Sequence, residues 1–318
     1  MNNTKQLQAS ISKFSATSLL SIDQLDRDSL DTLYALADDI IINPGRYTSA
    51  AKDKIMAAVF YEPSTRTSSS FIAAIQRLGG GVIPITGVEF SSVTKGETLE
   101  DTVTMLSGYS DLLVLRHPEP GTAQRAKKAS RVPIINAGDG VGEHPTQALL
   151  DGYTISKKLG KVDNITVTMV GDLKHGRTVH SLARLLTNYD NVSVNYVSPE
   201  ILKMPKTLIE ELDKKGLKQS EHSDIDAVIG DTDVLYITRV QKERFTDLNE
   251  YESLKNSYVV TPDLMQSAKD KMIVMHPLPR LGEISTDVDD DPRAVYFDQA
   301  KYGMYVRMAL IASILGKG

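Results

Sequence analysis

The sequence of 318 residues contains no cysteine. The chain therefore has no disulfide, no thiolate metal ligand and no thiol nucleophile, and a reducing cytoplasm is its simplest location. It has no apolar run long enough to cross a bilayer, and its first residues lack the features of a signal peptide, so we expect no membrane association. Acidic residues outnumber basic residues by 41 to 36, whereas nucleic-acid binders normally carry a basic excess. We therefore expect no nucleic-acid partner.

Several ligand-binding motifs are also missing. There is no GxxxxGK[ST] motif, which argues against a P-loop nucleotide site. The stretch GDGVGE at residues 138–143 lacks the third glycine of a dinucleotide fingerprint. The six histidines occur without cysteine and without HExxH spacing, so we expect no metal site.

Short apolar runs alternate with helical patterns along the whole chain. The runs lie at residues 55–61, 82–85, 111–115, 132–136, 165–170, 192–197, 233–237 and 272–275. Helical spacing is found between them, for example at residues 21–41, 98–109, 122–130, 177–187 and 206–215. Nearly continuous apolar strands are typical of parallel sheets that are covered on both faces. The sequence therefore predicts an α/β fold with two similar-sized domains, each a mainly parallel sheet flanked by helices.

The expected domain boundary lies at the long helix that follows Pro145. Residues 1–145 would form the first domain and residues 146–301 the second. The helix predicted at 302–318 has apolar residues that recur on one face, so it could pack on either half, and we expect it to pack back on the first domain.

Cations, imidazoles and hydroxyl groups follow most of the predicted strands. Ligands of open α/β sheets bind beyond the carboxyl ends of the strands, so these residues should share an electropositive region. The residues concerned include Ser64, Thr65, Arg66, Thr67, Arg116, His117, His144, Gln147, Lys174, His175, Arg177, Arg239, Gln241, His276 and Arg280.

The stretch FYEPSTRTSSSF at residues 60–71 shows this pattern at its densest. Ser64 and Thr65 suit the start of a helix, whose first N–H groups form an anion site. Arg66 adds a planar fork that fits phosphate oxygens. The alternative is a plain N-cap followed by a polar helix face. For His144 the alternative is a histidine satisfied within its loop, and Arg177 or Arg239 alone could be an ordinary surface cation.

Four motifs together resemble the aspartate/ornithine carbamoyltransferase family. They are STRT at 64–67, RHP at 116–118, HPTQ at 144–147 and HPLPR at 276–280. The resemblance extends from about Ser21 to the end of the chain. Three further stretches resemble the aspartate-specific branch, namely KGET at 95–98, VGDLKHGRTVHSL at 170–182 and TRVQKERF at 238–245. An ornithine-specific member would show HCLP at the position of HPLP.

The resemblance implies a role for each site residue. The phosphate of carbamoyl phosphate would be held by Ser64, Thr65, Arg66 and Thr67. The carbamoyl oxygen would be polarised by Thr67, Arg116 and His144, and the carbamoyl nitrogen positioned by Gln147, Leu278 and Pro279. Aspartate would be bound by Lys95, Arg177, Arg239 and Gln241. The groups closest to the chemistry would be Arg66, Thr67, Lys95, Arg116 and His144.

The resemblance also implies a reaction and partners. Carbamoyl phosphate and L-aspartate would give N-carbamoyl-L-aspartate and phosphate, an early step of pyrimidine synthesis, with no cofactor. The chain would form a homotrimer in which Ser91 and Lys95 reach the active site of a neighbouring subunit. Regulatory chains or fused domains stay open. One alternative is transfer to ornithine or a related amine, and another is a non-catalytic phosphate-ligand sensor on the same scaffold.

Overall fold

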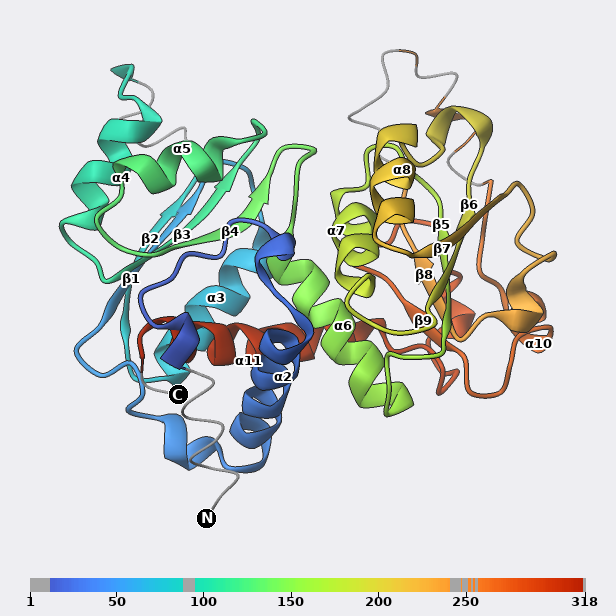
Figure 1. Cartoon of the computed structure of the whole chain (residues 1–318), viewed down its shortest axis with the longest axis horizontal. Coiled ribbons are helices and arrows are strands. Elements are labelled where there is room, and N and C mark those ends of the chain that lie inside the picture. The colour runs from blue at the N-terminus through green and yellow to red at the C-terminus, as the bar shows by residue number, and fades with distance from the viewer. Residues whose placement is uncertain are drawn as a thin grey trace. The chain divides into compact units, whose positions relative to one another are not determined.

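The computed structural model describes residues 12–87, 95–240, 247, 251–252, 254 and 257–316. The chain divides into two compact units (Figure 1). The first unit runs to Leu150 and takes in the chain again from Lys301, and the second unit is Asp151–Ala300. The division falls within helix α6 (Pro145–Leu159), a few residues after the boundary expected at 145.

The first unit contains a four-stranded sheet in the order β2-β1-β3-β4, in which every neighbouring pair is parallel. Its elements are α2 (Arg27–Ile42), β1 (Ile55–Phe60), α3 (Thr65–Arg77), β2 (Gly81–Thr86), α4 (Leu99–Ser107), β3 (Leu112–His117), α5 (Thr122–Ala129) and β4 (Ile134–Asp139). Short 3-10 turns lie at Ser12–Phe14, Ile22–Gln24 and Pro44–Tyr47. Helices α4 and α5 cover one face of the sheet, and α3 lies on the other (Figure 1).

The helix α4 shows how the apolar spacing of the sequence builds the core of the first unit. Thr98 caps the helix by accepting a hydrogen bond from the N–H of Asp101. Leu99, Val103 and Leu106 then recur on one face and pack into a buried cluster with apolar residues of β1, β3 and β4. Burial of such a stripe supplies most of the stability of a short helix.

The second unit contains a five-stranded parallel sheet in the order β7-β6-β5-β8-β9. Its elements are β5 (Thr166–Val170), α7 (Arg177–Leu186), β6 (Ser193–Val197), α8 (Lys206–Lys214), β7 (Lys218–His222), β8 (Val234–Ile237), α10 (Pro262–Gln266) and β9 (Ile273–Met275), with 3-10 turns at Glu200–Leu202, Ile229–Asp231 and Thr286–Val288. Two helix-flanked parallel sheets confirm the predicted fold class.

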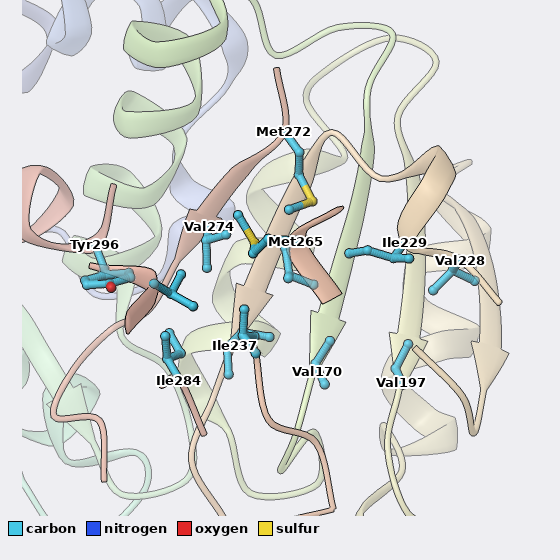
Figure 2. Close-up of a cluster of buried hydrophobic side chains, with 13 residues drawn as sticks. Val170, Val197, Val228, Ile229, Ile237, Met265, Met272, Val274, Ile284 and Tyr296 are labelled. Atoms are coloured by element: carbon cyan, nitrogen blue, oxygen red, sulfur yellow. The ribbon is translucent and has the colours of Figure 1, made fainter. Parts of the chain in front are cut away.

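A buried apolar cluster joins one face of the second sheet to the segments that cover it (Figure 2). Val170, Ile237 and Val274 contribute from three neighbouring strands, and Met265 of α10 and Tyr296 pack against them.

Within the described part of the chain, none of the helices is long and apolar enough to span a membrane.

Two sequence-based element predictions are wrong in detail, and one strand was not predicted. The helix expected from Ser21 begins only at Arg27, because Ser21 caps a short 3-10 turn and Asp26 caps α2 separately. The strand β7 was not predicted, because its sequence KQSEH is polar and lies at the sheet edge. The last helix, expected at 302–318, is α11 (Tyr296–Ile314) and begins earlier than its apolar pattern suggested.

The backbones at the ends of β5 and β8 approach each other closely at Gly171. The residue has a φ of +114°, and a Cβ added there would lie 2.1 Å from the carbonyl oxygen of Thr238. The N–H of Thr238 donates to the carbonyl of Val170 at 2.8 Å. Only glycine allows both the left-handed conformation and this contact.

We expect Gly171→Ala to lower the free energy of unfolding by about 3 kcal/mol or more, because the new Cβ must displace backbone. A matched control is Gly216→Ala, where φ is +84° but nothing lies within 4 Å of the added Cβ. That variant should lose only about 1 kcal/mol from the left-handed conformation. Urea unfolding of both variants measures the difference. Equal losses would show that the strand ends can separate freely at this point.

Candidate active site

The carboxyl end of β1 lies where the strand order of the first sheet reverses. Strands β2 and β3 pair with β1 on opposite sides, so the connections from β1 and β3 leave towards opposite faces. Open parallel sheets bind ligands at such a switch point. Residues 61–64 form a short loop there, and α3 begins directly after it.

The first turn of α3 supplies several hydrogen-bond donors to this switch point. The first N–H groups of a helix have no partner within the helix and carry a partial positive charge. The first turn contains no acidic residue, Arg66 is exposed and Thr67 is buried. The Ser64 side chain does not cap the helix, since its oxygen instead accepts a hydrogen bond from Arg116 Nη1 at 3.1 Å.

Arg116 is fixed at the end of β3 by two contacts. Besides Ser64, its Nε donates to Glu62 Oε2 at 3.0 Å, and both of these charged side chains are largely covered. A guanidinium held by a carboxylate and a hydroxyl keeps one orientation, which a mobile surface arginine would not. The structure therefore brings Ser64 and Arg116 together, as the sequence predicted, and adds Glu62, which the sequence analysis did not include.

His144 lies at the neighbouring strand end, in the loop between β4 and α6. The loop is shaped by Asp139, whose carboxylate accepts the N–H groups of Glu143 at 2.9 Å and Gly121 at 3.0 Å. Gly140 has a φ of +54°, and a Cβ there would lie 2.5 Å from the carbonyl oxygen of Pro118. The glycine-rich stretch therefore follows a tight backbone path at Gly140.

The start of α6 buries two of the predicted site residues. His144 is 4% exposed and Gln147 is 8% exposed. The carboxylate of Glu143 anchors the loop to the N-terminal segment, because it accepts the hydroxyl of Ser21 at 2.7 Å and the N–H of Ile22 at 2.9 Å. The imidazole of His144 is thus carried by a loop that is fastened at both ends.

His117, next to Arg116, has a structural role. Its ring packs against Tyr61 with the ring centroids 4.6 Å apart, and its Nδ1 accepts the N–H of Glu119. Burial lowers the pKa of His117, which keeps the ring neutral around pH 7.

The second sheet has its own switch point at β5, because β6 and β8 pair on opposite sides of it. Arg177 is the first residue of α7, which follows β5, and Arg239 comes directly after Thr238 at the end of β8. The close approach of Gly171 to Thr238 places these two connections side by side. Both arginines are half-buried at the position that an open sheet offers to a ligand.

Two histidines near Arg177 hold the loop after β5. Asp172 is fully buried and accepts the backbone N–H of His175 at 3.0 Å, and its carboxylate lies 3.2 Å from the ring Nδ1 of that residue. His180 Nε2 lies 2.7 Å from the carbonyl oxygen of Leu173, so this nitrogen carries the proton. Burial lowers the pKa of His180. Both contacts give these histidines a structural role in the loop.

Leu278 and Pro279 follow β9, the edge strand beside β8. The peptide bond between them is cis, and Leu278 has a φ of +56°. The guanidinium of Arg280 forms a two-fold ion pair with the carboxylate of Asp289, so this cation is engaged in holding its own loop.

Three predicted site residues remain, namely Ser91, Lys95 and Gln241. Lys95 is exposed just before α4. Ser91 and Gln241 lie outside the described residues. Among the residues that the structure describes, no three histidine, aspartate or glutamate side chains gather as a metal site would require.

The sequence analysis missed a set of carboxylates that hold the predicted cations and imidazoles. Glu62 holds Arg116, Asp172 contacts His175, and Glu283 contacts His276 at 2.8 Å. Glu62 and Asp172 lie within two residues of a predicted strand end, whereas Glu283 lies eight residues beyond one. The first two therefore had a local signal in the sequence, and Glu283 had none.

Comparison with protein families gives two matches that together cover most of the chain. Residues 17–157 match the aspartate/ornithine carbamoyltransferase, carbamoyl-P binding domain. Residues 163–314 match the aspartate/ornithine carbamoyltransferase, Asp/Orn binding domain.

Individual relatives agree with these matches. The chain is 52% identical to the aspartate carbamoyltransferase catalytic subunit of Thermoplasma acidophilum over 94% of its length and 98% of the relative. It is 52% identical to the multifunctional protein pyr1-3 of Dictyostelium discoideum, of which it spans only 14%. Aspartate transcarbamoylase of Trypanosoma cruzi, solved with carbamoyl phosphate and aspartate, superimposes with a TM-score of 0.91 at 45% identity, covering 96% of this chain and 98% of that one. The chain belongs to the aspartate/ornithine carbamoyltransferase family.

Proposed function

We propose that the chain transfers the carbamoyl group of carbamoyl phosphate to the amine of L-aspartate, giving N-carbamoyl-L-aspartate and phosphate. The observation that carries the proposal is the contact of Arg116 with Ser64 at 3.1 Å, which sets a fixed guanidinium beside the start of α3. The relatives named aspartate carbamoyltransferase, and the Trypanosoma enzyme solved with both substrates, support the choice of reaction.

The first unit would bind carbamoyl phosphate. The N–H groups at the start of α3 and the fork of Arg66 suit a phosphate dianion, because donors and positive charge converge there. Arg116 and His144 would face the carbamoyl oxygen, with Thr67 as a third donor. This oxygen gains negative charge as the amine attacks, and fixed donors therefore lower the barrier.

The second unit would bind aspartate. A dicarboxylate needs two separate cationic forks, and Arg177 and Arg239 supply them at one switch point. The cationic side chain of ornithine would be repelled by the same pair. Gln241 and Lys95 are proposed to assist, and Leu278 and Pro279 to orient the carbamoyl nitrogen with Gln147.

The reaction is then an addition followed by an elimination. The nitrogen lone pair of aspartate attacks the carbamoyl carbon, the bond from that carbon to the phosphate oxygen breaks, and phosphate leaves with the electron pair. The amine loses one proton, which the departing phosphate can accept. No electron transfer occurs, so the chemistry requires no redox cofactor. Orientation and fixed electrostatics supply the rate enhancement.

The proposal extends to a homotrimer in which Ser91 and Lys95 complete the site of a neighbouring subunit. This part rests on the family likeness. The Thermoplasma relative is named a catalytic subunit and the Dictyostelium relative a multifunctional protein, so regulatory chains and fused domains are both compatible with the proposal. A cytoplasmic location and a role in pyrimidine biosynthesis are proposed on the same basis.

Amine specificity gives the first test of this function. With carbamoyl phosphate present, phosphate release should be rapid with aspartate and undetectable above background with ornithine, because two arginines select a dicarboxylate. The measurement is steady-state phosphate release with each amine. Turnover with ornithine alone would support the other branch of the family, and binding of carbamoyl phosphate without turnover by any amine would support a sensor.

Substitution of Arg66 and substitution of Arg239 should affect the kinetics of different substrates. Arg66→Ala should lower kcat/KM for carbamoyl phosphate by roughly a thousandfold, because a fixed donor to the reacting group is lost. Arg239→Ala should mainly raise the KM for aspartate. Arg77→Ala is the matched control, since Arg77 is an exposed arginine at the other end of α3. Unchanged parameters for Arg66→Ala would refute the phosphate assignment.

Subunit mixing tests the shared site. Lys95→Ala and Arg66→Ala should each be inactive alone. If Lys95 acts in a neighbouring subunit, mixed trimers contain some sites with both residues intact, and part of the activity should return after the subunits are dissociated and reassembled together. Each variant reassembled with itself is the control. Mixed trimers that stay inactive would place Lys95 in the site of its own chain.

A further inference from the structure

His276 and Glu283 form a buried pair beside the segment that follows β9. His276 is 2% exposed and Glu283 is 5% exposed. Their side chains meet through Nε2 and Oε1 at 2.8 Å. A buried carboxylate and imidazole are costly to desolvate, so both need their hydrogen bonds satisfied.

The hydrogen bonds of His276 fix its tautomer. Its Nδ1 lies 2.7 Å from the backbone nitrogen of Leu278. A backbone N–H can only donate, so Nδ1 accepts and carries no proton. The ring proton is then on Nε2 and points at Glu283. The opposite tautomer, or the protonated ring, would set two N–H groups against each other at Leu278.

Glu283 is suited to hold this tautomer because it stays ionised. Its Oε2 accepts the N–H groups of Leu281 at 3.0 Å and Gly282 at 2.9 Å. Burial raises the pKa of Glu283, but the hydrogen bonds from His276 and from backbone N–H groups outweigh burial and lower the pKa to about 2. An ionised carboxylate can only accept, so His276 must present an N–H to it.

The pair acts on a backbone position that a leucine rarely adopts. Leu278 has a φ of +56°, in the left-handed region that disfavours residues with a Cβ. The backbone N–H of Leu278 donates to the ring Nδ1 of His276. The backbone N–H of His276 in turn donates to Gln299 Oε1 at 2.9 Å. Gln299 is anchored in turn, because its Nε2 donates to the buried Asp151 at 2.7 Å. A chain of buried contacts therefore determines the conformation at Leu278.

We propose that Glu283 and His276 are positioning residues for the carbamoyl group. Glu283 orients the imidazole of His276, the imidazole holds the N–H of Leu278, and the backbone at Leu278 and Pro279 is thereby aimed at the carbamoyl nitrogen. Neither side chain touches the substrate. The inference rests on the proposed function, which assigns Leu278 and Pro279 to that nitrogen.

Two substitutions at His276 separate positioning from simple stabilisation. In His276→Asn, the side-chain oxygen falls near the place of Nδ1, so the bond to Leu278 is kept and Glu283 loses its partner. In His276→Gln, the amide falls near the place of Nε2, so Glu283 keeps a donor and the bond to Leu278 is lost. Positioning therefore predicts that the Asn variant is the more active and the Gln variant the more stable.

In His276→Gln, kcat/KM for carbamoyl phosphate should fall tenfold or more, and in His276→Asn it should fall less. The KM for aspartate should stay nearly constant in both variants. Around metal sites, residues that orient a ligand through a neighbour typically show effects of about 10–100-fold, and we expect a similar scale here. Thermal unfolding should rank the two variants in the opposite order. Activity that follows stability would overturn the proposal.

Glu283→Gln tests the other end of the pair. The amide of glutamine has only one accepting oxygen, so it disturbs either the contact with His276 or the contacts with the two backbone N–H groups. We therefore expect kcat/KM for carbamoyl phosphate to fall tenfold or more. The matched control is Glu211→Gln, because Glu211 also uses both oxygens, but on Arg184 in another part of the same unit. Equal kinetics for Glu283→Gln and the control would overturn the proposal.

A measurement on the unaltered protein covers the case in which the variants fail to fold. Histidine ¹⁵N spectra should show His276 as the neutral Nε2–H tautomer, with its resonance assigned by replacing each of the other five histidines in turn. The Nδ1–H tautomer or an imidazolium at neutral pH would overturn the inference. Absence of phosphate release by the unaltered protein would refute the proposed function itself, whereas full activity with the wrong tautomer would refute only this inference.

Discussion

Parallel strand pairing is the constraint on which the rest of this molecule depends. A parallel sheet collects the carboxyl ends of its strands at one edge, and at β1 and β5 the strand order reverses, so neighbouring connections leave to opposite faces. Residues far apart in sequence then meet. Arg116 reaches Ser64 in this way, and the backbone of Gly171 meets Thr238. The donors that we propose for two anions are thus gathered by backbone topology.

Topology alone leaves cationic side chains mobile, and carboxylates remove that mobility. Glu62 orients Arg116, and Glu283 orients His276. Buried carboxylates are costly unless several donors surround them, and Glu283 has three such contacts. The guanidinium of Arg116 and the neutral ring of His276 therefore keep a fixed direction without any ligand. A charged group that is oriented in advance, such as Arg116, can lower a barrier without reorganising.

The sequence predicted the buried strands well, because a continuous apolar run such as that of β1 or β5 is a local signal. The polar and cationic residues that follow such a run mark the carboxyl edge of the sheet, where the anion-binding groups are expected. The polar edge strand β7 left no such signal, and the first turn of α11 lacks the apolar spacing of the rest. The partners of the cations were missed for another reason. Glu62 and Arg116 are 54 residues apart, and no periodicity links them.

Residues that would touch the substrate and residues that orient them differ in the same way, because local signals in the sequence reveal the role of only the first group. The residues expected to touch substrate are recognisable one motif at a time, whereas the residues that aim them become visible only in three dimensions. A leucine at φ +56° persists only where surrounding contacts determine it, and here these run through His276 to Gln299 and Asp151. Buried hydrogen bonds in the second unit therefore maintain an unfavourable backbone conformation at Leu278. On the proposed assignment, the geometry at the reacting group depends on side chains that never meet the substrate.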